Sequence, residues 1–281
     1  MFNKLKFLSL YYAFHLKKRF SPLAPTRPSA TVLLVRDSAE GLEVFMVVRH
    51  HKIDFASGAL VFPGGKVDPQ DRAQGLRAFC DGAAETDDKT LSFQIAAIRE
   101  VFEECGILLA RKDGANALLN AEQVTALASY REALHKNKID MQSFVTQENL
   151  RLACDQLHLF SHWVTPEMLP KRFDTHFYLV HAPDDQVGIH DGHESVDSVW
   201  ISPQTALQDE KAGKRTIVFP TRLNLEKLGQ SDTVQNAIQC LDASAAYEVM
   251  PKMRRKGIDV YLTLPEAAGY GNIEQLLSQV G

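Results

Sequence analysis

Three features of the sequence predict an α+β fold. Short apolar runs bounded by turn residues, typical of strands, begin at Ala30 and recur at residues 172–179. Apolar residues at three- and four-residue steps, typical of helices, occur at residues 98–107 and over roughly fifty residues after them. With 281 residues, 45% of them hydrophobic and 23% charged, the chain can bury a large core as one elaborated domain or one domain with appendages.

The chain is expected to begin with an extension, residues 1–29, that precedes the folded domain. Residues 1–20 are basic, and the first acidic residue is Asp37. The apolar stretch 7–14 is too short to span a bilayer. An organelle-targeting or membrane-surface helix and a plain extension are both open interpretations. The proline-rich residues 21–28 are expected to form a stiff linker.

The first strands are expected to form a β-hairpin. Residues 30–35 and 42–48 are apolar, and the polar residues 36–41 separate them. A basic cluster follows, with Arg49 and Lys52 on either side of two histidines. We expect Arg49 and Lys52 to contact a substrate phosphate, and a charged loop without a ligand is the alternative.

The next strand, around residues 60–62, runs into the double glycine Gly64-Gly65. Two glycines let the backbone adopt conformations closed to other residues and can bring a main-chain carbonyl close to a bound ion. Carbonyl and carboxylate oxygens together suit Mg²⁺ or Mn²⁺.

Carboxylates for such an ion stand in the predicted helix 98–107. Glu100, Glu103 and Glu104 fall at i, i+3 and i+4, so they share one helix face, and Arg99 reaches that face four residues before Glu103. Three carboxylates this close repel each other unless a positive charge lies between them, and a divalent cation with oxygen ligands is the natural candidate. Taken alone, a run of this kind is commonly just a solvated helix face.

Together the glycine turn and the acidic helix resemble the signature of the Nudix hydrolases. The family's box is glycine, five residues, glutamate, seven residues, then Arg-Glu-apolar-x-Glu-Glu-x-Gly-apolar. Residues 99–107 match the second part at every specified position. Gly65 matches the first part, with Asp71 where the family has glutamate. The resemblance implies an α/β/α sandwich with a mixed sheet.

The box of this chain contains an insertion. Residues 72–98 separate Asp71 from Arg99, where the family has seven residues, so residues 72–91 look inserted. Glycines and acids in this stretch predict a solvated loop rather than a core element. A long surface loop costs little extra closure entropy and need not destroy the site, but the contribution of Asp71 is left open.

A helical insert is predicted at residues 111–157. Residues 120–135 and 143–157 carry helical periodicity, with Ser143 as the cap of the second helix. The two helices are expected to cover the mouth of the site or to build a dimer contact. On this interpretation residues 30–229 form the Nudix domain, and residues 230–281 form a helical or extended appendage packed on it.

A second resemblance concerns the substrate. The segments Trp-x-Thr-Pro at 163–166 and Arg-Phe-Asp-Thr-x-Phe at 172–177 resemble the peroxisomal acyl-coenzyme A diphosphatase branch of the family and its bacterial relatives. Arg172 and Asp174 are expected either to meet the substrate or to form a buried ion pair that fixes their strand.

The histidines show no zinc spacing, so no zinc site is expected. Glu194 differs from them because it precedes the predicted strand 196–201, where several Nudix enzymes place a carboxylate that binds metal or takes a proton from water. Ser202 is expected to cap the helix that follows this strand, and another helix is expected near residues 232–241.

The resemblance implies a divalent-metal-dependent hydrolase of a diphosphate bond, with coenzyme A or an acyl-coenzyme A as the substrate. Arg99 would orient the glutamates, and Glu100 or Glu194 would accept a proton from water. The ligands of one to three Mg²⁺ or Mn²⁺ ions would be the Gly65 carbonyl, Glu100, Glu103 and Glu104. A Nudix hydrolase of ADP-ribose, NADH or dinucleotides and a catalytically silent binding module are the alternatives.

Other classes of function are less consistent with the sequence. A net charge of −4 gives no indication of a nucleic-acid partner, and no integral membrane segment is expected. The four cysteines are scattered, which favours reduced thiols in a cytosolic setting. The final residues lack the Ser-Lys-Leu peroxisomal address, so a cytoplasmic location is expected. Whether the chain forms a homodimer is left open.

Overall fold

A mixed β-sheet forms the centre of the fold. The computed structural model describes residues 23–50, 57–192, 195–242 and 247–277. The strands of the central sheet are β1 (Thr26–Ser38), β2 (Gly41–Arg49), β3 (Leu60–Val61), β4 (Gly64–Lys66), β7 (His158–Val164), β8 (Arg172–His181), β9 (Ser195–Ile201) and β10 (Glu248–Val249). In these described ranges the sheet has eight strands, in the order β10-β7-β8-β1-β2-β3, with β4 paired to β1 and β9 paired to β2.

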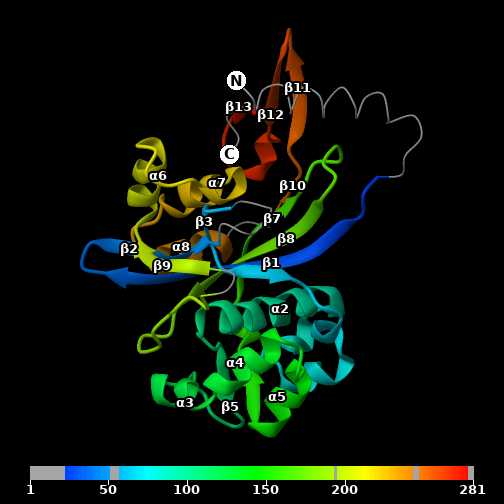
Figure 1. The fold of residues 1–281 in the computed structure, drawn as a ribbon, viewed down its shortest axis with the longest axis vertical. Helices are drawn as coiled ribbons and strands as arrows, with labels where there is room; N and C mark the ends of the chain where they lie inside the picture. Colours follow the sequence, from blue (N-terminus) through cyan, green and yellow to red (C-terminus); the bar gives the residue numbers. More distant parts are fainter. Residues whose placement is uncertain (1–22, 51–56, 193–194, 243–246, 278–281) are drawn as a thin grey trace.

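Helices cover both faces of this sheet, as the α/β/α prediction requires. The helices are α2 (Asp88–Cys105), α3 (Ala121–Ala126), α4 (Ala128–His135), α5 (Met141–Gln147), α6 (Pro203–Lys211), α7 (Phe219–Leu228) and α8 (Val234–Asp242). Figure 1 shows α2 to α5 on one side of the sheet and α6 and α7 on the other.

The side chains of β1 divide the core into two clusters. Ala30, Val32 and Leu34 point toward the cluster that includes α2, whereas Leu33 and Val35 point toward the cluster under α6 and α7. All five are fully buried. Because both faces of the central strand are covered, its sequence is a continuous apolar run rather than an alternating one.

The predicted hairpin is confirmed, but β1 is longer than expected. β1 pairs antiparallel with β2 as far as Ser38 and Gly41. It also pairs in parallel with β8 from its first residue, Thr26, so residues 26–28 belong to the sheet and not to a linker. Pro28 is tolerated there because it lacks only a donor, and its carbonyl accepts a hydrogen bond from the Val67 N–H at 2.9 Å.

The insertion at residues 72–91 is folded, so the expectation of a solvated loop was wrong. It contains two short 3₁₀ helices, η2 (Gln74–Phe79) and η3 (Ala83–Glu85). Leu76, Cys80 and Ala83 are at most 4% exposed and join the core cluster beneath α2. These three apolar residues recur at three- and four-residue steps, and the glycines and acids between them masked this pattern.

The helical insert also differs from its prediction, since it has three helices and a strand, β6 (Leu150–Leu152), that closes a two-stranded antiparallel sheet, instead of two helices. α5 begins after Asp140, whose carboxylate accepts a hydrogen bond from the Ser143 N–H at 2.7 Å. Asp140, not Ser143, is therefore the cap. The chain then turns at Asn149 (φ 51°), and β6 (Leu150–Leu152) pairs with β5 (Ala110–Lys112) where a helix was expected.

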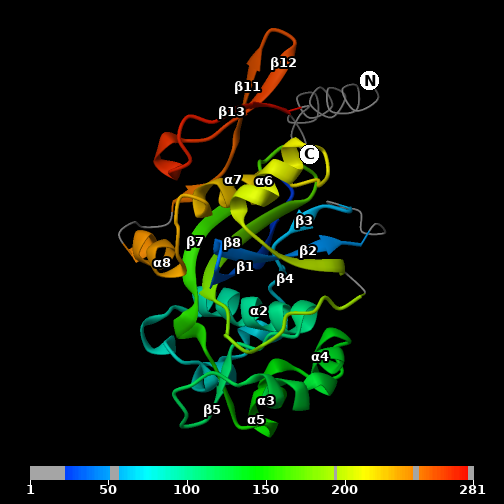
Figure 2. The same cartoon turned by 90° about the vertical axis from the view of Figure 1, so that its left-hand side faces the viewer.

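The other face of the sheet carries the last part of the chain. Ser202 caps α6 as predicted, because its hydroxyl accepts a hydrogen bond from the Thr205 N–H at 3.1 Å. Strands β11 (Lys252–Lys256), β12 (Asp259–Thr263) and β13 (Glu274–Leu276) form a small antiparallel sheet beyond α7. Figure 2 shows the β11–β12 hairpin extending away from the rest of the molecule. Among the described helices, none has both the length and the apolar character needed to cross a membrane.

Candidate active site

The predicted acidic helix is the second half of α2, and its two ends are firmly capped. At the start, the Asp87 carboxylate accepts a hydrogen bond from the Thr90 N–H at 3.0 Å. At the end, Gly106 adopts φ 70°, and its N–H donates to the Phe102 carbonyl at 2.9 Å. Glycine is favoured there because this left-handed conformation is strained for other residues. The caps and the packing of α2 on the sheet fix the direction in which its acidic face points.

Arg99 joins the two halves of the box. Its side chain is only 2% exposed, and its guanidinium grips Asp71 through two hydrogen bonds, Nε to Oδ1 and Nη2 to Oδ2, both at 2.9 Å. Nη2 also donates to the Lys66 carbonyl at 2.9 Å. Nη1 donates to Glu100 at 3.1 Å and to Glu103 at 3.3 Å. A single planar cation thus holds the loop after the glycine turn and two carboxylates of α2 in one arrangement.

Asp71, whose contribution was left open, is part of this network despite the insertion. It is 1% exposed, and its Oδ2 also accepts a hydrogen bond from the Asp68 N–H at 2.7 Å. Burial raises the pKa of Asp71, and the hydrogen bonds from Arg99 oppose that rise. The geometry gives Asp71 the task of holding Arg99, because both of its oxygens are turned toward the guanidinium.

The two glycines meet different neighbours. Gly64 has φ 148°, and a Cβ atom there would lie 2.3 Å from the Ala30 carbonyl oxygen in β1. Its N–H donates to the Glu104 carboxylate at 2.9 Å. A Cβ atom on Gly65 would lie 2.5 Å from Oε1 of Glu100. Gly64 is therefore required by the backbone of the sheet, while Gly65 makes room for a carboxylate.

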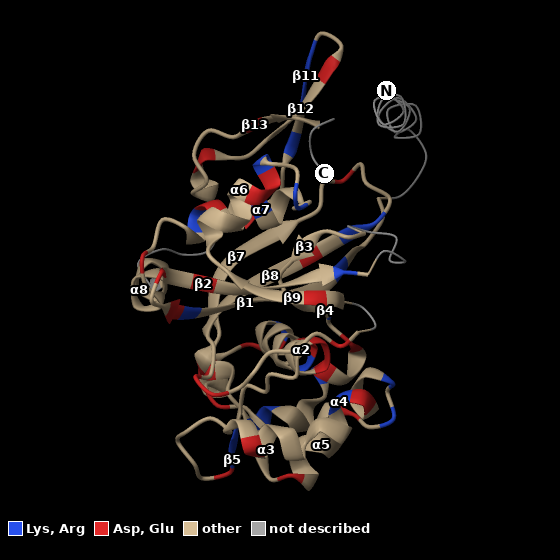
Figure 3. Ribbon diagram, turned by 60° about the vertical axis from the view of Figure 1, so that its left-hand side comes forward, with Lys and Arg blue, Asp and Glu red and all other residues tan. Residues whose placement is uncertain are grey.

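Carboxylates outnumber the cationic groups described at this site. Asp71, Glu100, Glu103 and Glu104 carry four negative charges when ionised, Arg99 contacts the first three of them, and Arg131 adds a positive charge near Glu104. Burial raises the pKa of Glu103, and the charge of Arg99 works against this rise. Figure 3 shows acidic positions gathered along α2 beside β4 and α4. Excess negative charge and an oxygen-only set of donors fit a hard dication such as Mg²⁺ or Mn²⁺.

Comparison with known proteins agrees with this geometry. The model of the NUDT19 Nudix domain matches residues 78–228, which is more than half of the chain. The chain belongs to the Nudix hydrolase family. A solved Nudix hydrolase from Alicyclobacillus acidocaldarius is 27% identical and superposes with a TM-score of 0.64, covering 78% of this chain and 97% of its own.

Two curated Nudix relatives are similarly distant in sequence. A Caenorhabditis elegans Nudix protein is 28% identical over 204 residues, 73% of this chain and 61% of its own length. The human protein named acyl-coenzyme A diphosphatase NUDT19 is 28% identical over 209 residues, 60% of this chain and 56% of its own length. The chain therefore spans about three fifths of these Nudix relatives.

Arg49 is the last residue of β2. It pairs in register with Ser195, the first residue of β9. Its Nε atom is buried and has no hydrogen-bond partner in the described part of this Nudix chain. Lys52 and Glu194 lie outside the described residues.

Arg172, predicted to contact substrate or to pair with Asp174, is held by backbone carbonyls and not by Asp174. It is 8% exposed, and its guanidinium donates to the carbonyl oxygens of Thr165 and Ala24, both at 3.1 Å. Asp174 pairs instead with His162 at 2.5 Å. Arg172 is thus better described as a residue that holds the start of β8, since the carbonyls satisfy it inside the protein.

Two residues of the helical insert reach the site of this Nudix domain and were not predicted. Arg131 on α4 donates to the carbonyls of Glu103 and Glu104, both at 2.7 Å, and to that of Ile189 at 2.9 Å. It thereby covers the free carbonyls at the end of α2. His135 lies at the end of the same helix, with Nδ1 3.8 Å from Oε2 of Glu103. Sequence periodicity placed both residues on a helix but could not show which element that helix would meet.

Proposed function

We propose that this chain hydrolyses the diphosphate bond of a nucleoside diphosphate derivative, with Mg²⁺ or Mn²⁺ as its cofactor. The observation that carries the proposal is the buried network in which Arg99 holds Asp71, Glu100 and Glu103 beside Gly65. Burying so many carboxylates around one arginine is costly unless the remaining charge is neutralised, and a dication supplies that charge.

In the proposed site the Gly65 carbonyl, Glu100, Glu103 and Glu104 hold the metal. A bound Mg²⁺ or Mn²⁺ would neutralise phosphoryl oxygens and lower the pKa of an attacking water. The contact between Gly65 and the Glu100 carboxylate supports this assignment, because a side chain at position 65 would fill the space the carboxylate needs.

The remaining residues orient the metal ligands, accept a proton or bind a substrate phosphate. Arg99, itself fixed by Asp71, orients Glu100 and Glu103. Glu100 is the less enclosed of these two glutamates, with a side chain 15% exposed, and it or Glu194 accepts the proton of the attacking water. Arg49 binds a phosphate of the substrate, which would give its buried Nε a partner.

Coenzyme A or an acyl-coenzyme A is the proposed substrate. The names of the human and Xenopus laevis relatives, acyl-coenzyme A diphosphatase NUDT19, support this choice. The products would be 3′,5′-adenosine bisphosphate and 4′-phosphopantetheine or its acyl form. A cytoplasmic location and a homodimer stay predictions.

Hydrolysis of coenzyme A, acetyl-coenzyme A, ADP-ribose and NADH with Mg²⁺ or Mn²⁺ tests the proposal. We expect the fastest cleavage with a coenzyme A compound. Glu103→Gln should lower kcat/KM at least about 100-fold, because it removes one metal ligand and one partner of Arg99. Glu132→Gln is the matched control, since Glu132 is an exposed acid of α4 that pairs with Lys136; it should change kcat/KM less than about twofold.

Each outcome separates one part of the proposal from another. If ADP-ribose or NADH is cleaved fastest, the chemistry stands and the substrate assignment is wrong. If no compound is cleaved and Glu103→Gln binds metal as the wild type does, the chain is a binding module instead of a hydrolase.

A further inference from the structure

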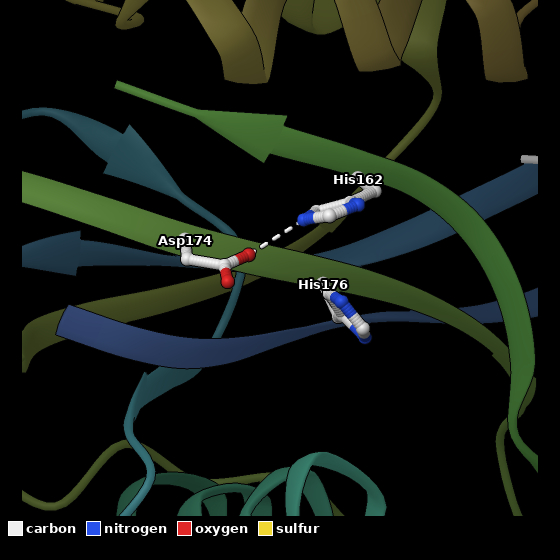
Figure 4. A group of neighbouring side chains, drawn as sticks. All are labelled: His162, Asp174 and His176. Carbon is white, nitrogen blue, oxygen red and sulfur yellow. Dashed lines mark hydrogen bonds and ion pairs between the residues drawn. The ribbon is translucent and has the colours of Figure 1, made fainter. Parts of the chain in front are cut away.

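A second group of metal-ligating side chains lies outside the box. His162 on β7 stands directly opposite His176 on β8 in the antiparallel ladder. Asp174 precedes His176 by two residues, so both project from the same face of β8. One ligand atom from each of the three side chains lies within 4.8 Å of the other two. Figure 4 shows the Asp174 carboxylate directed at the His162 ring, with His176 beside them.

This cluster is distinct from the candidate active site. It lies under the beginning of α2, where the Phe93 ring stacks on the His176 ring at 4.0 Å between centroids. Phe93 and Glu100 are seven residues apart on the same helix, a rise of about 10 Å. The cluster is half-closed, because the side chains of His162 and Asp174 are 16% and 18% exposed. A small ion has access to it from solvent.

We propose that His162, Asp174 and His176 bind a single zinc-class dication. Two imidazole nitrogens and one carboxylate are a ligand set that suits Zn²⁺, with water in the fourth position. Around a tetrahedral Zn²⁺ with bonds of about 2.0–2.1 Å, neighbouring ligand atoms stand about 3.3 Å apart. The ligand atoms here all lie within 4.8 Å of one another, and the closest pair, on His162 and Asp174, is 2.5 Å apart, so modest side-chain rotations would bring them to that spacing.

The surroundings of the cluster favour this use. His176 is only 8% exposed, so the protein encloses this side of the cluster. Phe93 stacks on the His176 ring and limits its rotation. The competing cation is Lys89, whose Nζ is 3.7 Å from Asp174, but the Lys89 side chain is 68% exposed and can swing into solvent.

An ion at this site would link β7 to β8 beneath the first turns of α2. Histidine spacing predicted no zinc site, because these ligands come from two strands and only the register of the ladder brings them together. The site is independent of the proposed hydrolase function, since none of its three residues belongs to the box.

Zn²⁺ titration of the metal-free full chain, in competition with a chromophoric chelator and with excess Mg²⁺ to occupy the box carboxylates, tests this proposal. We expect one Zn²⁺ per chain and a raised Tm. His162→Gln and Asp174→Asn should each weaken Zn²⁺ binding at least about tenfold. His158→Gln is the control, because His158 begins the same strand β7 but is outside the cluster.

Two results would overturn the proposal. One is a wild-type chain that takes up no Zn²⁺ while Mg²⁺ is in excess, and the other is Asp174→Asn binding Zn²⁺ as tightly as the wild type. Co²⁺ binding to the wild-type chain tests the assigned ligands even if the variants fold poorly. A four-coordinate site with nitrogen ligands gives intense visible absorption, whereas weak six-coordinate bands alone would exclude the assigned ligands.

Discussion

Arg99 is the residue on which the candidate site depends most. A guanidinium that is 2% exposed would be costly to bury alone, and its partners satisfy it on every side. Asp71 accepts hydrogen bonds from one side of it, while Glu100 and Glu103 accept hydrogen bonds from its Nη1. Aspartate serves here although the family's box has glutamate, because η1 (Pro69–Arg72) carries the carboxylate to the guanidinium.

Removing the Asp71 carboxylate should destabilise the fold strongly. We expect Asp71→Ala to lower the free energy of unfolding by about 3–5 kcal/mol, because Arg99 loses its bidentate partner inside the protein. Asp68→Asn is the matched control, since the Asp68 carboxylate is 3.8 Å from Arg99 and 45% exposed, and it should cost less than about 1 kcal/mol. Urea unfolding followed by circular dichroism measures both. Equal losses for the two variants would contradict this account.

Gly65→Ala should damage catalysis more than folding. The new Cβ would lie 2.5 Å from Oε1 of Glu100, and a flexible carboxylate can move away at modest cost. Moving a catalytic carboxylate by about 1 Å lowers kcat about 100-fold, so we expect a loss of that order. Gly64→Ala provides the contrast, because its Cβ would meet the Ala30 backbone at 2.3 Å and φ is 148°; there we expect at least about 1–3 kcal/mol of lost stability. A Gly65→Ala enzyme with wild-type kcat would refute the assigned role of this glycine.

At the scale of elements, four charged residues fasten the box insertion to the helical insert. Arg111 on β5 and Arg151 on β6 stand opposite each other and would repel. Asp81 from the insertion lies between them, at 2.8 Å from Arg111 and 2.6 Å from Arg151. Asp155 adds a second partner for Arg111 at 2.7 Å. The insertion is thus tied to the rest of the fold by ion pairs as well as by its buried apolar residues.

Arg111→Met should loosen this connection in a pH-dependent way. Burial acts to raise the pKa of Asp155, but the hydrogen bonds from Arg111 and Gln156, together with the charge of Arg111, hold that pKa below its usual 3.8. The pair's contribution is therefore fully present above about pH 4 and is lost as the pH falls through the lower value of the folded state. We expect a loss of about 2–3 kcal/mol at pH 7 and a smaller difference from wild type below pH 4.

Lys112→Met on the same strand is the control for this experiment. Lys112 is 43% exposed and lies 3.8 Å from the Glu148 carboxylate, so its loss should cost less than about 1 kcal/mol. Stability of the three proteins is compared by urea unfolding at pH 7 and at pH 3.5. If the loss of unfolding free energy in Arg111→Met is larger at pH 3.5 than at pH 7, the assigned role of the Asp155 carboxylate is wrong.

The sequence predicted the elements whose signals are local. The caps of α6, the hairpin of β1 and β2, and the face shared by Glu100, Glu103 and Glu104 depend on residues a few positions apart. Burial of the insertion was missed because Leu76, Cys80 and Ala83 lie in a short stretch broken by Asp81 and Gly82, and only contact with the core cluster of α2 shows their common face.

Side-chain partners across long separations were also beyond sequence reasoning. Arg172 was expected to meet the substrate or to pair with Asp174 because these charges are visible in the sequence, while the carbonyls of Thr165 and Ala24 that it contacts are not. The hydrogen bonds of Arg131 to the end of α2 and the register that joins His162 to His176 depend in the same way on tertiary packing.

At the scale of the whole molecule, the two core clusters share one sheet. β1 and β2 contribute side chains to both clusters, so neither face can lose its cover without exposing strands that the other face needs. The C-terminal segment takes part in this arrangement, since Leu262, Leu264 and Ala268 belong to the cluster under α6 and α7. We therefore expect the described domain to unfold as one cooperative unit.

Tyr270→Phe tests this cooperativity from the C-terminal segment. The half-buried Tyr270 donates its hydroxyl hydrogen to Oδ1 of Asn224 on α7 at 2.6 Å, and its oxygen accepts from Nε1 of the buried Trp163 on β7 at 3.2 Å. Removing this hydroxyl leaves a buried donor unsatisfied, which should cost about 1–3 kcal/mol. Tyr261→Phe is the control, because Tyr261 lies on β12 outside the core cluster, half-buried with its ring beside Lys256, and it should change stability by less than about 0.5 kcal/mol.

The form of the unfolding curve then distinguishes one unit from two. If the C-terminal segment is part of a single cooperative unit, calorimetry shows one transition for wild type and Tyr270→Phe, and the whole transition moves to lower temperature. Two transitions, of which Tyr270→Phe moves only one, would mean that the segment folds separately. In that case the core cluster under α6 and α7 would hold together without Leu262 and Leu264, although both are at most 9% exposed in the intact fold.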